Sequence, residues 1–83
     1  MNINLKDEVR RALKMEWPAF AASHPKLAAV LDETILIDPA TQSLAADAEY
    51  VEAMQTATAV GAGGEIVADI ILRHVRQWLR RLV

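Results

Sequence analysis

The longest regular pattern of apolar and polar residues covers the last nineteen residues, from Glu65 to Val83. At about 100° per residue, the charged residues fall on one strip of a helix and the apolar residues on an arc of about 200°. The apolar arc contains Val67, Ile70, Ile71, Leu72, His74, Val75, Trp78, Leu79 and Leu82. One packed neighbour cannot cover so wide an arc. The pattern therefore predicts a long amphipathic helix that is covered by its own chain and by a second copy.

A second helical pattern occupies the beginning of the chain. The apolar residues at helical spacing are Leu5, Val9, Ala12, Leu13, Trp17 and Phe20. Asn4 is a suitable N-cap, and Asp7 places a carboxylate in the first turn, where the helix dipole favours it. Pro18 disfavours helical geometry at Trp17, so we expect this helix to end or kink there.

The segment after the first helix contains a break and a restart. Proline suits the first position of a helix, so Pro25 predicts a short helix over residues 26–33 with His24 or Ser23 as its cap. The apolar, β-branched segment 34–38 then predicts an extended link or a brief strand. A single strand has no partner within this chain, so we expect it to pair with its copy across a two-fold axis.

Asp38 and Pro39 form another cap-plus-proline start, which predicts an alanine-rich helix as far as Val60. Its narrow apolar stripe consists of Leu44, Ala48, Val51, Met54 and Thr58. The turn 61–64, Gly-Ala-Gly-Gly, then ends it, with Gly61 suited to the left-handed position after a helix. Together these elements predict an all-α fold: one domain over residues 1–83, a small bundle of three to four helices, and an αα-hairpin through the glycine-rich turn into the C-terminal helix.

The small size of the chain favours association between subunits. A core of 83 residues rarely leaves more than about 3–5 kcal/mol of stability unless something else reinforces it. There is no cysteine for disulfides and no cluster of metal ligands in the sequence. We therefore expect a homodimer. Its interface should contain Trp78 from the centre of the apolar arc, and Ile70, Leu72 and Leu79 from its exposed flanks.

Charges are distributed unevenly along the chain, although the net charge is only −2. Residues 32–72 contain eight acidic residues and no basic one, and this segment lies between two basic ends. One interpretation is that the ends fold back onto the acidic middle. The other is that the acidic surface attracts a basic partner.

The candidate catalytic and ligand-binding residues do not form a recognisable site. His24 and His74 have no nearby histidine or cysteine at metal-ligand spacing, and Ser23 beside His24 is not a nucleophile–base pair. A helix precedes the glycine-rich turn and Glu65 follows it, whereas phosphate-binding loops follow a strand and avoid an acid there. We therefore expect no enzymatic activity, no metal and no cofactor.

Two short segments resemble known families. Gln55, Ala59 and Gly63 resemble the spacing of helix-turn-helix DNA-binding proteins, but Asp69 occupies a position that is apolar in that pattern. Gln42-Ser43-Leu44 resembles the Asp-Ser-Leu of acyl carrier proteins, which implies Ser43 as the attachment point of a phosphopantetheine arm. In this chain Gln42 replaces the aspartate.

The preferred function from the sequence is a non-enzymatic helical protein–protein interaction module or small subunit that self-associates. The charged first 22 residues differ from a signal peptide, and no apolar run is long enough to span a membrane, so we expect a cytoplasmic protein. The first alternative is a nucleic-acid-associated regulator that uses Arg73, Arg76, Arg80 and Arg81. This alternative is less favoured than the interaction module, since Glu65 and Asp69 repel phosphate. An acyl-carrier-like domain is the second alternative.

Overall fold

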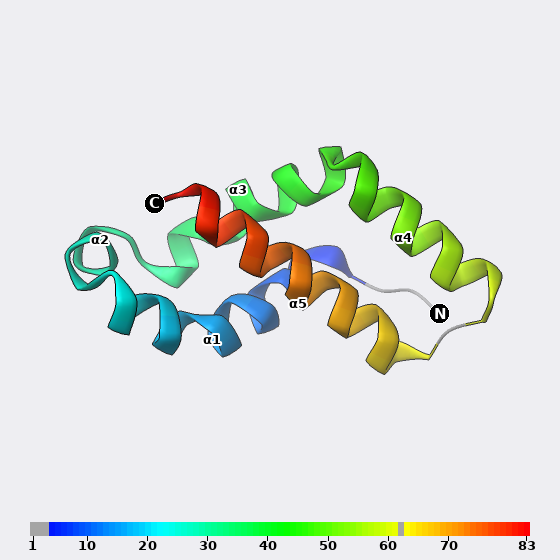
Figure 1. Cartoon of the computed structure of the whole chain (residues 1–83), viewed down its shortest axis with the longest axis horizontal. Helices are drawn as coiled ribbons and strands as arrows, with labels where there is room; N and C mark the ends of the chain where they lie inside the picture. Colours follow the sequence, from blue (N-terminus) through cyan, green and yellow to red (C-terminus); the bar gives the residue numbers. More distant parts are fainter. Residues whose placement is uncertain (1–3, 62) are drawn as a thin grey trace.

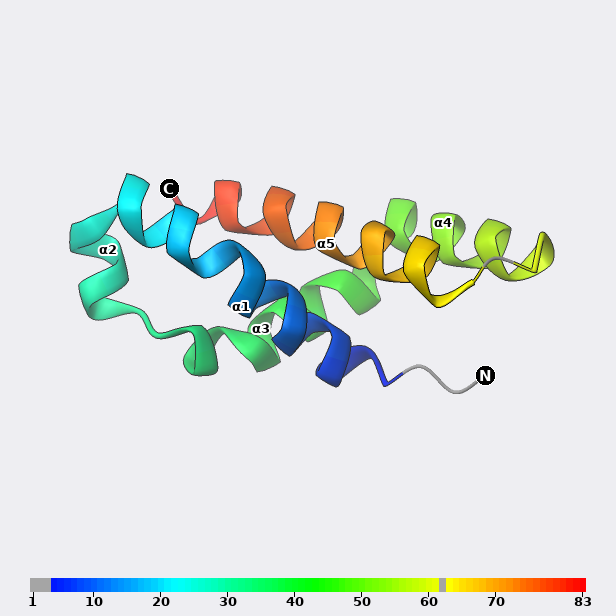
Figure 2. The same cartoon turned by 90° about the horizontal axis from the view of Figure 1, so that it is seen from below.

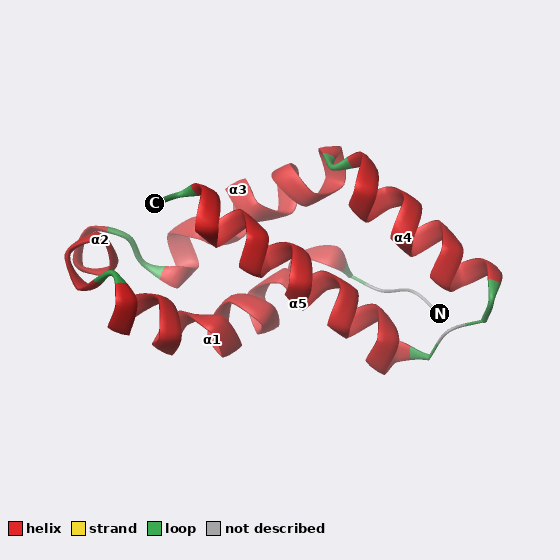
Figure 3. Cartoon of the chain, in the orientation of Figure 1, coloured by secondary structure: helices red, strands yellow, loops and turns green. Residues whose placement is uncertain are grey.

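The computed structural model describes residues 4–61 and 63–83, and it confirms the predicted all-α class (Figures 1 and 3). Within this part of the chain there are five helices and no strand. The helices are α1 (Leu5–Ser23), α2 (Pro25–Val30), α3 (Glu33–Ala46), α4 (Ala48–Ala59) and α5 (Gly64–Arg81). The long amphipathic C-terminal helix predicted from the sequence corresponds to α5.

Helix α1 starts where the sequence predicts but does not end at Trp17. The Asn4 side-chain oxygen accepts hydrogen bonds from the backbone N–H groups of Lys6 and Asp7, at 3.1 and 3.4 Å. The helix then continues through Pro18 to Ser23. The Pro18 ring faces solvent, and the turn after it buries Phe20 against the core. The apolar contacts made by this last turn offset the backbone hydrogen bond that the proline removes.

The segment predicted as a strand or an extended link is helical, so that prediction is wrong. Residues 34–38 belong to α3, which starts after Asp32 and contains Pro39 in its interior. The Asp32 side chain accepts hydrogen bonds from the backbone N–H and the hydroxyl of Thr34, both at 2.9 Å. The buried residues of α3 recur at helical spacing: Leu36, Ile37, Ala40 and Leu44. Burial of this face outweighs the weak β-propensity of the segment.

The predicted alanine-rich helix is divided into two helices at Asp47. The backbone N–H of Asp47 donates to the carbonyl of Leu44 at 3.1 Å, which ends α3. Its side chain accepts hydrogen bonds from the N–H groups of Glu49 and Tyr50, at 2.9 and 3.2 Å, which starts α4. The rotation at this joint changes the buried face. Tyr50 and Ala57 are buried in α4, whereas Val51 in the predicted stripe is exposed.

The helices form an elongated body of 42 × 21 × 18 Å. Helix α5 lies across α1 and α3, and α4 lies alongside the N-terminal half of α5 (Figures 1 and 2). Helix α2 packs on α1 alone, and α4 packs on α5 and α3 but not on α1 within the described residues. The most completely buried large side chains come from α1 and α5: Val9, Leu13, Ile71 and Val75.

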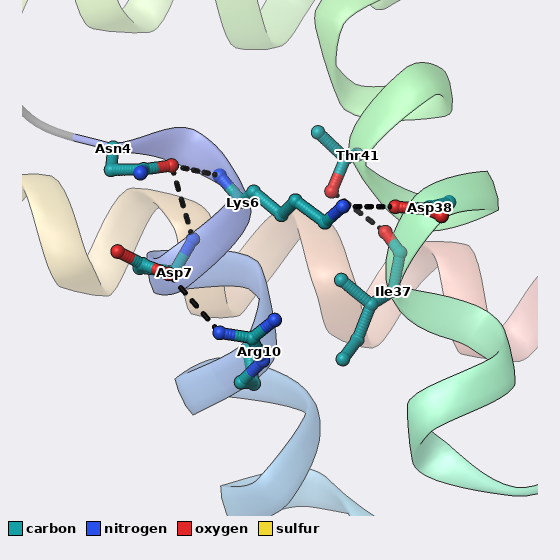
Figure 4. A network of polar contacts seen from close by, with 7 residues as sticks. All are labelled: Asn4, Lys6, Asp7, Arg10, Ile37, Asp38 and Thr41. Atoms are coloured by element: carbon teal, nitrogen blue, oxygen red, sulfur yellow. Dashed lines mark hydrogen bonds and ion pairs between the residues drawn. The ribbon is translucent and has the colours of Figure 1, made fainter.

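A polar contact also joins α1 to α3 (Figure 4). The Lys6 ammonium lies 2.8 Å from a carboxylate oxygen of Asp38, and both side chains are exposed. One turn further along α3, the Thr41 hydroxyl donates to the carbonyl of Ile37 at 2.7 Å. Lys6 belongs to the basic N-terminal end and Asp38 to the acidic middle, so this contact agrees with the interpretation that the ends fold onto the middle. Two further ion pairs of α1, Arg10 with Asp7 and Arg11 with Glu8, are local, and a third joins Glu16 to Arg76 of α5.

The connection between α4 and α5 contains a left-handed residue where the sequence predicts it. Gly61 has a φ of 68°, a value that only glycine adopts easily. Ala62, the second residue of the predicted turn, lies outside the described residues. Gly63 precedes α5 as its cap residue. The two helices on either side run antiparallel, as an αα-hairpin requires (Figure 1).

Candidate interaction surface

A surface groove of about 520 Å³ runs between α4 and α5. We call it the α4–α5 groove. Its lining residues are Glu49, Glu52, Ala53, Thr56, Ala57 and Val60 from α4 and the turn, and Ile66, Ile70 and Arg73 from α5. The deepest of them are Ala57 and Ile70, which are buried. Alanine is short, so the α4 side of the groove fills little of the space beside α5.

The end of the groove nearest the glycine-rich turn is apolar and open to solvent. Val60 is 74% exposed and Ile66 is 54% exposed. Ile66 lies on the otherwise charged face of α5, between Glu65 and Asp69 in the sequence. Covering a large exposed apolar side chain with a partner is favourable, because it removes that side chain from water.

The other end of the groove is charged, with opposite signs on its two sides. Glu49 and Glu52 line the α4 side, and Arg73 lines the α5 side. None of these three side chains takes part in an ion pair among the described residues. Helix α4 itself contains no lysine or arginine. The charged end of the groove can therefore accept charges of both signs from a partner.

The predicted interface residues do not lie together. Ile70 and Leu79 are 8% and 4% exposed, so the expectation that they lie on exposed flanks of α5 is wrong. The wide apolar arc of α5 is enclosed by α1 on one side and by α3 and α4 on the other. Leu72 and Trp78 are half-buried and pack against the same core. Of the four residues, Ile70 lines the α4–α5 groove.

A second groove, of about 620 Å³, lies between the C-terminal ends of α1 and α5. Its apolar lining includes Phe20 and the exposed Met15 and Val83. Arg76 crosses one side of it, with its Nε 2.6 Å from a carboxylate oxygen of Glu16. This ion pair connects α5 to α1 and neutralises the arginine that lies nearest to Glu16. The groove therefore has less unpaired charge than the α4–α5 groove.

His74 is a buried polar residue at the joint between α3 and α4. Its ring meets the ring of Tyr50 edge to face, with centroids 5.5 Å apart. Its Nδ1 atom is 4.0 Å from Asp47 Oδ2, and this nitrogen has no hydrogen-bond partner in the described part of the chain. The Asp47 side chain thus caps α4 with one oxygen and faces α5 with the other. His74 is part of the core, as its place within the apolar arc of α5 suggests.

Two side chains near the ends of helices have shifted pKa values. Hydrogen bonds from the backbone N–H and the hydroxyl of Thr34 lower the pKa of Asp32, because they stabilise its carboxylate form. Burial raises the pKa of Tyr50, because its ionised form loses contact with water. Neither residue lines the α4–α5 groove: the lowered pKa of Asp32 reflects its capping hydrogen bonds, and the raised pKa of Tyr50 reflects its burial.

The residues of the alternative functions lie on three different helices. Ser43 lies half-buried in the interior of α3. Gln55 and Ala59 belong to α4, whereas Asp69 lies exposed on α5. Arg80 and Arg81 are exposed at the end of α5. In residues 4–61 and 63–83, no metal-ligating side chains cluster in a group of three or more, and none of the helices could cross a membrane.

The sequence reasoning missed five groove residues as interface candidates: Val60, Ile66, Glu49, Glu52 and Arg73. Ile66 carried a usable signal, because it is a large apolar residue on the charged face of a strongly amphipathic helix. Val60 carried a weaker one, as an apolar residue directly before a helix-ending glycine. The acidic residues of α4 gave no signal, since exposed acids are common on helices.

No protein-family model matches the chain, and no curated protein or solved structure matches it either.

Proposed function

We propose that this chain is a non-enzymatic helical module that binds a protein partner through the α4–α5 groove. The observation that carries the proposal is the exposure of Val60 and Ile66 at one end of a groove whose other end is charged. Apolar side chains flanked by charges are typical of grooves that receive one face of an amphipathic helix. The proposal keeps the self-association and the cytoplasmic location expected from the sequence.

A site-specific photo-crosslinking experiment in the native host tests this function. A photoreactive amino acid replaces Thr56, an exposed residue that lines the groove. The control position is Val30, which is 78% exposed on α2, remote from the groove. We expect a discrete protein adduct from position 56 and none from position 30.

The variant Ile66→Asp makes the experiment specific. Replacing an exposed isoleucine by a charged residue leaves the core intact but removes one of the two exposed apolar side chains at this end of the groove. The adduct from position 56 should disappear in this variant, while the far-ultraviolet circular dichroism stays unchanged. Adducts that persist in Ile66→Asp, or that form equally from position 30, would contradict the proposed function.

A further inference from the structure

We infer that the partner of the α4–α5 groove is the same groove of a second copy of this chain. This inference rests on the proposed function and names its partner. It follows from the distribution of apolar and charged residues along the two antiparallel helices of the hairpin. In such a hairpin, residues at equal distance from the turn lie side by side. Val60 and Ile66 flank the turn, whereas Glu52 and Arg73 lie further from it at similar height.

A two-fold axis parallel to the hairpin brings two grooves face to face in a complementary way. It places α4 of each copy over α5 of the other, antiparallel, as in a four-helix bundle. Val60 then meets Ile66 of the second copy, and Glu52 meets Arg73 of the second copy. Because the axis repeats every contact, the dimer has two apolar contacts and two ion pairs of this kind.

The other face-to-face arrangement is unfavourable. An axis perpendicular to the hairpin would place α4 on α4. Helix α4 has Glu49 and Glu52 but no basic residue, so acids of the two copies would approach each other without a compensating charge. The charges thus select the arrangement with α4 on α5. Arg73 has no ion-pair partner among the described residues of its own chain, so it is available to a carboxylate of the second copy.

Reversal of single charges tests the dimer in solution. Sedimentation equilibrium of the native chain should show a species of twice the 9.2 kDa chain mass, at protein concentrations of tens to hundreds of micromolar. Glu52→Arg and Arg73→Glu each create two like-charge contacts. Each variant should weaken the dimer by about tenfold or more. Lys26→Glu, a charge reversal on α2, is the control and should leave the association unchanged.

Recombining the reversed charges distinguishes this interface from any other. An equimolar mixture of Glu52→Arg and Arg73→Glu should form a heterodimer with near-native affinity, because both pairs again have opposite signs. The double variant in one chain should likewise regain self-association. A native chain that stays monomeric, or reversals that fail to weaken the dimer or to rescue each other, would overturn the inference.

The two proposals fail in different ways. If position 56 crosslinks to a different protein and the native chain is monomeric, the second-copy inference is wrong and the proposed function stands. If position 56 gives no adduct that depends on Ile66, the proposed function itself is wrong. An adduct of twice the chain mass that depends on Ile66 supports both.

Discussion

The molecule has two regions, which we call the body and the arm, and their helices differ in which side chains they bury and which they expose. The body consists of α1, α3 and the C-terminal half of α5, and it contains the large side chains Val9, Leu13 and Val75, which are fully buried. The arm consists of α4 and the N-terminal half of α5. Helix α4 buries only Tyr50 and the small Ala57, and it has no contact with α1 within the described residues.

This difference separates stability from availability for binding. Buried area determines most of the free energy gained on folding, and large side chains provide most of that area. The body therefore holds the fold together. The arm contributes less and keeps apolar side chains accessible on its surface. A chain this small cannot enlarge both regions, because its total core is limited.

The largest expected effect is in the body. Leu13 is 0% exposed, and Leu13→Ala should lower the free energy of unfolding by about 2–5 kcal/mol. That is close to the whole stability expected for such a domain, so thermal unfolding followed by circular dichroism should lose its cooperative transition. Met54→Ala, on the half-buried side of α4, should cost about 1 kcal/mol or less. Equal losses for the two variants would abolish the distinction between body and arm.

The turn at the end of the arm should show a smaller effect. Gly61 has a positive φ, and nothing lies within 4 Å of an added Cβ, so any cost of Gly61→Ala comes from the backbone alone. We expect a loss of about 1–2 kcal/mol in urea unfolding. Gly63 also has open space around it but an ordinary φ of −73°. Gly63→Ser should therefore change stability by a few tenths of a kcal/mol at most, in the stabilising direction.

A substitution at Asp47, the joint between body and arm, should destabilise mainly α4. Asp47→Ala removes the cap of α4 and should cost about 1 kcal/mol. Because α4 has little other support, its amide hydrogens should exchange about fivefold faster, while those of α1 change less. Asp47→Asn retains a capping oxygen and serves as the control. Uniform acceleration in α1 and α4 would mean that the arm does not open separately.

The smallest effect concerns the cap of α3 in the body. The pKa of Asp32 is lowered in the folded chain, so its carboxylate contributes stability above its ordinary pKa. This contribution is lost as the pH falls through the lowered value. Between about pH 5 and about pH 2, the native chain should lose slightly more thermal stability than Asp32→Asn. Parallel acid profiles for the two proteins would exclude a role for this carboxylate.

Local signals in the sequence were sufficient for the starts of α1 and α2, for α5 and for the left-handed residue of the turn. The N-cap Asn4, the proline at the first position of α2, the amphipathic pattern of α5 and the left-handed Gly61 are each determined by nearby residues. The all-α class follows from them. Local signals were not sufficient for segment 34–38. Its β-branched residues favour extended structure locally, whereas the packing of α3 against α1 favours a helix.

The surface could not be predicted in the same way. The width of the apolar arc on α5 does not reveal which helices cover it, and the break at Asp47 rotates α4 relative to α3. The coverage of the arc depends on contacts between residues that are distant in sequence, whereas the break depends on the capping hydrogen bonds of Asp47. Ile70 and Leu79 are therefore buried within the chain. The exposed Ile66, in contrast, lay outside the predicted arc.

The distribution of aromatic residues gives the molecule two intrinsic optical reporters. Both tryptophans, Trp17 and Trp78, belong to the body, and the single tyrosine, Tyr50, lies on α4. Tryptophan emission therefore follows the body. Ionisation of the phenol follows the arm, because burial raises the pKa of Tyr50 and detachment of α4 would return it to its ordinary value. The opening of the arm can thus be followed in the unlabelled protein by absorbance at alkaline pH, while the body is monitored by fluorescence.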